Sequence, residues 1–184
     1  SQAIYATIDK DLQETAQIAL TGFTGAIVVL EKNTGRVLAM ASSPGYNPKL
    51  FTPENANQSA LAELQGSYWL NRATQGQYPL GSVFKIITIA AALESGIYTQ
   101  DSSLMCGYHF DEVAGLQLHD WTWDHYQEDG VTQPSGELTL PQGLMRSCNI
   151  WFYHIGLDFY NRGMVNNIAD MAHGFGLGST TGIE

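Results

Sequence analysis

Ser82 and Lys85 stand three residues apart at the start of a strongly apolar run. Residues three apart on a helix share a face, so the Lys85 amine can lie close to the Ser82 hydroxyl. Burial in an apolar helix disfavours the charged amine and lowers its pKa from the usual value of about 10.4. An uncharged amine can take the proton of a serine and make it a nucleophile. The pair therefore predicts covalent acyl transfer; the alternative is an accidental spacing inside a buried helix.

The position of Ser82 at the start of this helix also matters. It follows Pro79-Leu80-Gly81, where free backbone amides and the helix dipole favour a developing negative charge.

Gly76 and Gly81 also have the glycine spacing of a phosphate-binding loop. That motif requires lysine directly after the second glycine, and Ser82 stands there instead. We therefore reject a nucleotide-binding function.

A second polar cluster is Ser147-Cys148-Asn149. The Ser147 hydroxyl can relay a proton between Lys85 and a leaving amine. The Asn149 amide can bind a substrate amide and also hold Lys85. The alternative is a capping or turn cluster, which serine and asparagine often form.

Several elements must position these residues. Apolar spacing, caps and glycines predict a helix that begins after Asp9 and ends before Gly22, and a helix that ends at Gly96. Residues 97–136 read as irregular and aromatic. The predicted helices cover residues 10–20, 58–64, 82–95, 140–146 with Pro141 in the first turn, 150–160 and 165–173.

Residues 25–42 read as a β-hairpin with a turn at 32–35, where Gly35 permits a positive φ. The first strand is continuously apolar, which predicts a sheet covered on both faces. The expected class is α+β, with an antiparallel sheet built on hairpin 25–42 and packed with a mainly helical subdomain.

The composition excludes some partners. The chain has 184 residues and a formal net charge of −10. An acidic surface repels the phosphates of nucleic acids and anionic lipids, so we expect no nucleic-acid partner. No apolar run reaches the ~20 residues of a membrane span. We expect any membrane anchor to lie outside these residues.

Four residues are of types that can act as zinc ligands: Cys106, Asp120, His125 and Cys148. Two thiolates, an imidazole and a carboxylate can fill a tetrahedral structural Zn²⁺ site, and His109 and His119 are alternative ligands. The two cysteines can instead form a Cys106–Cys148 disulfide or remain inert thiols. The spacing leaves these alternatives open. Trp121 and Trp123 are interpreted as core or groove aromatics.

Taken together, the motifs resemble those of the penicillin-binding proteins, and the resemblance spans essentially the whole chain. It is nearest to the class B, elongation-type members. Ser82-Val83-Phe84-Lys85 is similar to the SxxK motif of that family, and Ser147-Cys148-Asn149 to its SxN motif. The other similar segments are Thr7-Ile8-Asp9, residues 25–40, residues 71–81 and residues 175–183.

The resemblance implies a partial penicillin-binding/serine β-lactamase-like fold. It implies that Ser82 attacks the D-alanyl-D-alanine carbonyl of a peptidoglycan stem peptide, with Lys85, Ser147 and Asn149 as the other catalytic residues. It implies no cofactor for catalysis, although some relatives carry zinc beside the second motif. The third motif, Lys-Thr/Ser-Gly, is absent from the 184 residues. We expect residues 1–184 to be the N-terminal portion of a single transpeptidase domain.

The implied partners are peptidoglycan stem peptides, β-lactam antibiotics and a glycosyltransferase of the cell-wall elongation machinery. The implied location is the extracytoplasmic face of the bacterial cell membrane. Two other functions remain open. One is a serine β-lactamase or D,D-carboxypeptidase of the same superfamily, and the other is a non-catalytic β-lactam-sensing domain.

Overall fold

The computed structural model describes residues 5–47 and 66–182, which divide into two compact units. The first unit covers residues 1–78 and the second residues 79–184, and each has its own buried core. The helix predicted at 58–64 lies outside the described residues. Among the described helices, none has the length and apolarity that a membrane span requires.

The first unit contains the predicted hairpin. Strands β1 (Gly25–Leu30) and β2 (Val37–Ser43) pair antiparallel, from Gly25 opposite Ser43 to Leu30 opposite Val37. Helix α1 (Lys10–Ala19) begins as predicted, because the Asp9 side chain accepts the Leu12 amide at 2.9 Å. The described residues of this unit also contain two short elements, η2 (Gly66–Trp69) and α3 (Arg72–Gln75).

One face of this hairpin is well covered. Helix α1 packs against β2, and small residues let the two approach closely: Ala16 on the helix, and Ala39 and Ala41 on the strand. On the other face, where α3 also contacts the strands, Val28 and Leu30 remain 43% and 56% exposed. Within the described residues of this unit, the cover predicted for both faces is therefore incomplete.

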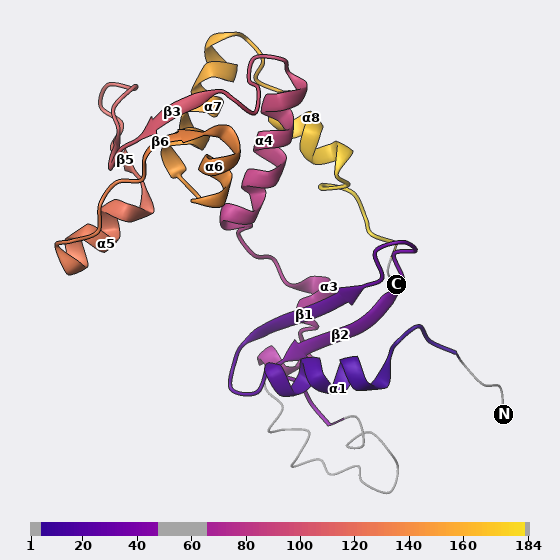
Figure 1. Cartoon of the computed structure of the whole chain (residues 1–184). Coiled ribbons are helices and arrows are strands. Elements are labelled where there is room, and N and C mark those ends of the chain that lie inside the picture. Colours follow the sequence, from indigo (N-terminus) through magenta and orange to yellow (C-terminus); the bar gives the residue numbers. More distant parts are fainter. Residues whose placement is uncertain (1–4, 48–65, 183–184) are drawn as a thin grey trace, which may run out of the picture. The chain divides into compact units, whose positions relative to one another are not determined.

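The second unit is mainly helical. Its first turn is a 3₁₀ helix, η3 (Gly81–Phe84), which continues into α4 (Lys85–Glu94), so the helix predicted over 82–95 has two parts. Helices α4, α6 (Leu140–Met145) and α7 (Asn149–Asn161) pack together beside the antiparallel pair β3 (Ser103–Cys106) and β6 (Gly136–Thr139) (Figure 1). Helix α8 (Asn167–Gly174) packs on α4. The largest fully buried hydrophobic side chains of this core are Leu140, Trp151, Ile155 and Phe159.

The segment expected to be irregular contains more structure than predicted. Besides β3 it holds a small pair, β4 (His109–Phe110) and β5 (Leu118–His119), and helix α5 (Trp121–Asp129), and β6 begins at its last residue. Asp120 caps α5, and Gly130 ends it at a φ of 67°. This helix mixes aromatic with polar residues and lacks an apolar stripe, so its hydrophobic pattern did not predict a helix. The helices and small antiparallel sheets confirm the α+β class.

A substitution at Gly143 tests the packing of α6 against Trp151 of α7, the two helices that flank Ser147. A Cβ atom at Gly143 would lie 2.4 Å from Cδ1 of Trp151, whose Nε1 donates to the Leu138 carbonyl at 3.0 Å. We expect Gly143→Ala to lower the free energy of unfolding by about 1–3 kcal/mol in urea titrations. Gly156 of α7 is the matched control, because a Cβ atom at Gly156 would have nothing within 4 Å beyond its own helix. Gly156→Ala should raise that free energy by about 0.5–1 kcal/mol. Equal stability of the two variants would contradict this packing.

Candidate active site

Ser82 lies in η3 with its side chain exposed, at a cavity of about 450 Å³. The other lining residues come from α5, from the loop between α6 and α7, and from the start of α7: Trp121, His125, Arg146, Ser147 and Asn149. No side chain caps the first turn of η3. The two predicted motifs therefore meet at one cavity, although 62 residues separate Lys85 from Ser147.

Lys85 is the centre of the polar contacts. Its Nζ donates to the Ser147 carbonyl at 2.7 Å, to Ser147 Oγ at 3.0 Å and to Asn149 Oδ1 at 2.6 Å. Nζ also lies 5.2 Å from the centre of the Phe152 ring. Burial lowers the pKa of the Lys85 amine below its ordinary value, and the negative charge of Asp120 opposes this shift. The predicted link between Lys85 and the second motif is thus present as direct contacts.

The hydrogen bond expected between Ser82 and Lys85 is not formed among the described contacts. All hydrogen bonds of Lys85 Nζ to described residues go to Ser147 and Asn149, and none goes to Ser82. Ser82 lies in η3 and Lys85 is the first residue of α4, so the two are one turn apart where the first helix continues into the second. Catalytic hydrogen bonds are often longer in a free enzyme than in its substrate complex.

Ser147 has an unusual backbone. Its φ is 53°, the one positive value among the described residues other than glycine. It directly follows Arg146, the C-cap of α6; the Ser147 amide donates to the Leu144 carbonyl and the Cys148 amide to the Gly143 carbonyl, both at 3.0 Å. These two bonds form a Schellman motif, in which this position is usually glycine. A serine here costs about 1–2 kcal/mol and brings its hydroxyl to Lys85.

Asp120 connects α5 to the second motif. Its side chain is fully buried; Oδ1 accepts the Asn149 amide at 2.6 Å, and Oδ2 accepts the Thr122 hydroxyl at 2.8 Å. The backbone carbonyl of His119 also accepts the Asn149 side chain, at 3.4 Å. Asp120 was predicted as a zinc ligand. Its carboxylate instead fixes the first residue of α7, which carries the amide that holds Lys85.

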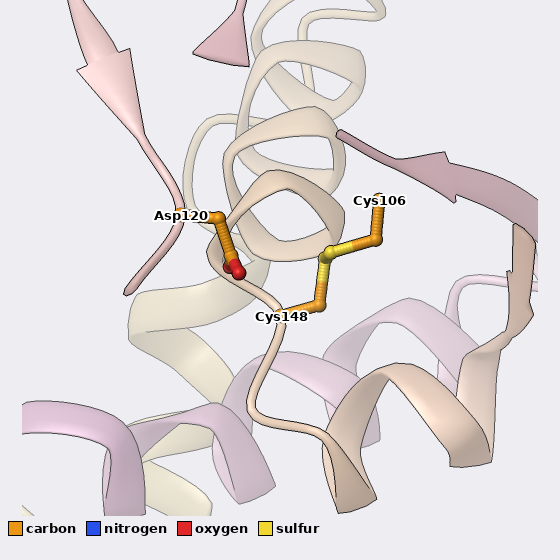
Figure 2. A group of neighbouring side chains, drawn as sticks. All are labelled: Cys106, Asp120 and Cys148. Carbon is orange, nitrogen blue, oxygen red and sulfur yellow. A yellow bond between two sulfur atoms is a disulfide. The ribbon is translucent and has the colours of Figure 1, made fainter. Parts of the chain in front are cut away.

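The two cysteines form the disulfide that was the alternative to zinc. Figure 2 shows the Cys106–Cys148 bond beside the Asp120 carboxylate. The two sulfurs and a carboxylate oxygen all lie within 4.8 Å of one another. Bonded sulfurs offer no thiolate to a metal, and His125 does not belong to this group. The residues as arranged therefore do not fit the predicted tetrahedral zinc site, and we correct that prediction to a disulfide.

The three histidines proposed as ligands make other contacts. His125 lies edge-on to Trp121, with ring centres 5.3 Å apart. His119 Nε2 pairs with Asp124 at 2.9 Å, and His109 packs against Trp123 with ring centres 4.5 Å apart.

Two lining residues were not assigned to the site from the sequence. Trp121 was interpreted as a core or groove aromatic, and it lines the cavity. Its Nε1 donates to the Arg146 carbonyl at 3.0 Å, and the Arg146 guanidinium lies 5.9 Å from the centre of the Trp121 ring. The one available signal for Arg146 was its place directly before Ser147.

Residues 25–184 match the sequence profile of the penicillin binding protein transpeptidase domain. This match covers well over half of the chain. The chain belongs to the penicillin-binding protein transpeptidase family. Transpeptidases of this family act without a cofactor.

The peptidoglycan D,D-transpeptidase MrdA of Escherichia coli is 32% identical to this family member over 185 residues. The match covers 98% of the chain and 27% of MrdA, so the chain spans about a quarter of the length of that relative. A solved penicillin G acyl-enzyme complex of penicillin-binding protein A from Mycobacterium tuberculosis is 31% identical, with a TM-score of 0.72. That match covers 94% of this chain and 40% of the other.

A third similar structure belongs to a peptidoglycan synthase complex that coordinates polymerization and crosslinking. Its matching chain is 34% identical, with a TM-score of 0.69, and the match covers 96% of this chain and 31% of that chain.

The strained backbone of Ser147 in this penicillin-binding protein domain leads to a stability prediction. Ser147→Gly and Ser147→Ala both remove the hydroxyl that contacts Lys85, but only alanine keeps a Cβ atom at positive φ. We expect the glycine variant to have the higher free energy of unfolding, by about 1 kcal/mol, in urea titrations. An alanine variant as stable as the glycine variant, or more stable, would show that this residue is not left-handed.

Proposed function

We propose that this chain contributes the nucleophile, its base and the second motif to a peptidoglycan D,D-transpeptidase that acts through a serine acyl-enzyme. The observation that carries the proposal is the position of the Lys85 amine: it forms hydrogen bonds with Ser147 and Asn149 and lies one turn from Ser82. The names of the similar proteins support the same function.

In the proposed first step, Ser82 Oγ attacks the carbonyl between the two D-alanines of a stem peptide. Lys85 accepts the hydroxyl proton as the C–O bond forms. Lys85 and Ser147 then pass a proton to the departing amine while the C–N bond breaks, and D-alanine leaves. In the second step an amine of a neighbouring stem attacks the ester. A new amide forms, and Ser82 recovers its proton.

Asn149 has two roles in this proposal. Its Oδ1 holds Lys85, and its amide group binds the acyl donor beside Ser82. The amides at the start of η3 favour the negative charge that develops on the carbonyl oxygen. β-Lactams resemble the donor and would leave Ser82 acylated.

We further propose that residues 1–184 form the N-terminal portion of one transpeptidase domain. The third motif would then be supplied by sequence outside these residues, together with the second oxyanion amide. Loss of one oxyanion donor typically lowers the rate about 10²–10³-fold. We therefore expect the 184 residues alone to turn over little or no substrate.

The proposed partners of the complete protein are stem peptides and a glycosyltransferase that makes the glycan strands. The relative in a complex that joins polymerization to crosslinking supports the second partner. The proposed location is the extracytoplasmic face of the bacterial membrane. A disulfide beside the second motif fits an oxidising compartment of this kind.

Intact mass spectrometry of the complete protein tests the function. Incubation with a fluorescent penicillin should add one adduct, and peptide mapping should place it on Ser82. The Ser82→Ala variant should acquire none. An adduct at another residue, or none on the wild type, would refute the assignment. Rapid hydrolysis of the penicillin would instead favour a β-lactamase or carboxypeptidase, and a stable adduct without turnover of stem peptides would favour a sensing domain.

The pH dependence of acylation tests the role of Lys85. The amine must be uncharged to accept the Ser82 proton, and burial lowers its pKa. The second-order rate of acylation should therefore fall as pH decreases through the lowered pKa, and it should already be high below the ordinary lysine value of about 10.4. Stopped-flow measurements from about pH 5 to about pH 10 check this. A rate that rises only near the ordinary lysine pKa would contradict it.

A further inference from the structure

Arg146 is the unassigned charged residue at the candidate active site. Residues 79–184 contain three lysine or arginine side chains, namely Lys85, Arg146 and Arg162. Lys85 is held by the second motif, and Arg162 pairs with Asp158 at 3.5 Å. Arg146 makes no ion pair with any described residue, although acidic residues outnumber basic ones 18 to 8 in the chain.

Trp121 orders this arginine at the rim of the cavity. The indole nitrogen of Trp121 donates to the Arg146 backbone carbonyl, and the guanidinium lies over the indole ring. A ring under the guanidinium removes water from one of its faces and leaves its N–H donors at the edge. Arg146 is also the C-cap of α6, so its backbone is fixed by the turn that carries Ser147. The charge is therefore held on the lining of the same cavity as Ser82, without an acidic partner from the described chain.

This arrangement has the chemistry of a carboxylate receptor. Arginine presents paired N–H donors that match the two oxygens of a carboxylate. The cavity has Ser82 on its lining, so an anion bound by Arg146 would belong to the molecule that Ser82 attacks. Arg146 also precedes Ser147 and Asn149, the side of the cavity that binds the acyl donor in the proposed function.

We propose that Arg146, supported by Trp121, binds a carboxylate of the acyl donor on the acyl side of the bond that Ser82 attacks. The inference rests on the proposed function and narrows its substrate class. The preferred donors are peptides with a free carboxylate on the acyl side of the reacting carbonyl, in addition to the carboxylate of the departing D-alanine. Donors in which that acyl-side carboxylate is a neutral amide should react more slowly.

A matched pair of penicillins tests this. Carbenicillin differs from benzylpenicillin by one carboxylate on the side chain, which lies on the acyl side of the lactam bond. The second-order rates of Ser82 acylation by both compounds are measured for the complete protein and for Arg146→Gln. We expect the substitution to lower the rate with carbenicillin, relative to benzylpenicillin, by about fivefold. Arg146→Lys should keep part of the preference, and added salt should reduce the wild-type difference.

Arg162→Gln is the matched control. It removes the same charge at the far end of α7, about 20 Å along a helix of 13 residues from Asn149. The carbenicillin to benzylpenicillin ratio should stay at the wild-type value. An Arg146→Gln variant with an unchanged ratio would overturn the inference while leaving the proposed function intact, because Ser82 would still be acylated. If neither compound acylates wild-type Ser82, the proposed function itself is wrong.

Discussion

The amine of Lys85 imposes the main constraint on this structure. A half-buried amine must be either paired or uncharged, and here a hydroxyl, a backbone carbonyl and an amide oxygen from one short segment surround it. A charged Lys85 donates to all three, whereas the uncharged amine keeps two N–H donors and a lone pair that can accept the Ser147 hydroxyl. These acceptors are neutral, so they satisfy its N–H groups without the stabilisation of the charge that a directly bonded carboxylate would give. Burial can then lower the pKa of the amine while leaving it ordered, which a proton acceptor for Ser82 requires.

The rest of the second unit holds the segment that contacts this amine. The Schellman turn places Ser147, the Asp120 carboxylate holds the Asn149 amide, and the Cys106–Cys148 disulfide ties the residue between them to β3. These three restraints are of different kinds. They oppose the cost of the left-handed serine, which a glycine would avoid at the loss of the hydroxyl. The geometry thus exchanges some local stability for a fixed position of two functional groups.

Much of the helical framework could be predicted from the sequence, because α4 and α7 have apolar residues at helical spacing and clear ends. Helix α5 could not, since Trp121 and Trp123 alternate with polar residues and the Asp120 cap is visible only once the helix is known. The site residues Ser82, Lys85, Ser147 and Asn149 were found from their types and from the resemblance. Their contacts depend on packing between segments some 60 residues apart, which no local pattern encodes. Cysteines at this spacing can bind a metal or form a disulfide, so the sequence left that choice open. The role proposed for Arg146 depends on the Trp121 ring beneath its guanidinium, which only the structure shows.

The central claim is that the pKa of the Lys85 amine lies below the ordinary lysine value, because the amine is half-buried among neutral acceptors. Nuclear magnetic resonance of the protein with labelled lysine side chains measures this directly, with Lys85→Arg identifying the signal. We expect the pKa of Lys85 to lie below the ordinary lysine value of about 10.4, because burial disfavours its charged form. A Lys85 signal that titrates at or above the ordinary lysine pKa of about 10.4 in the folded protein would contradict the account.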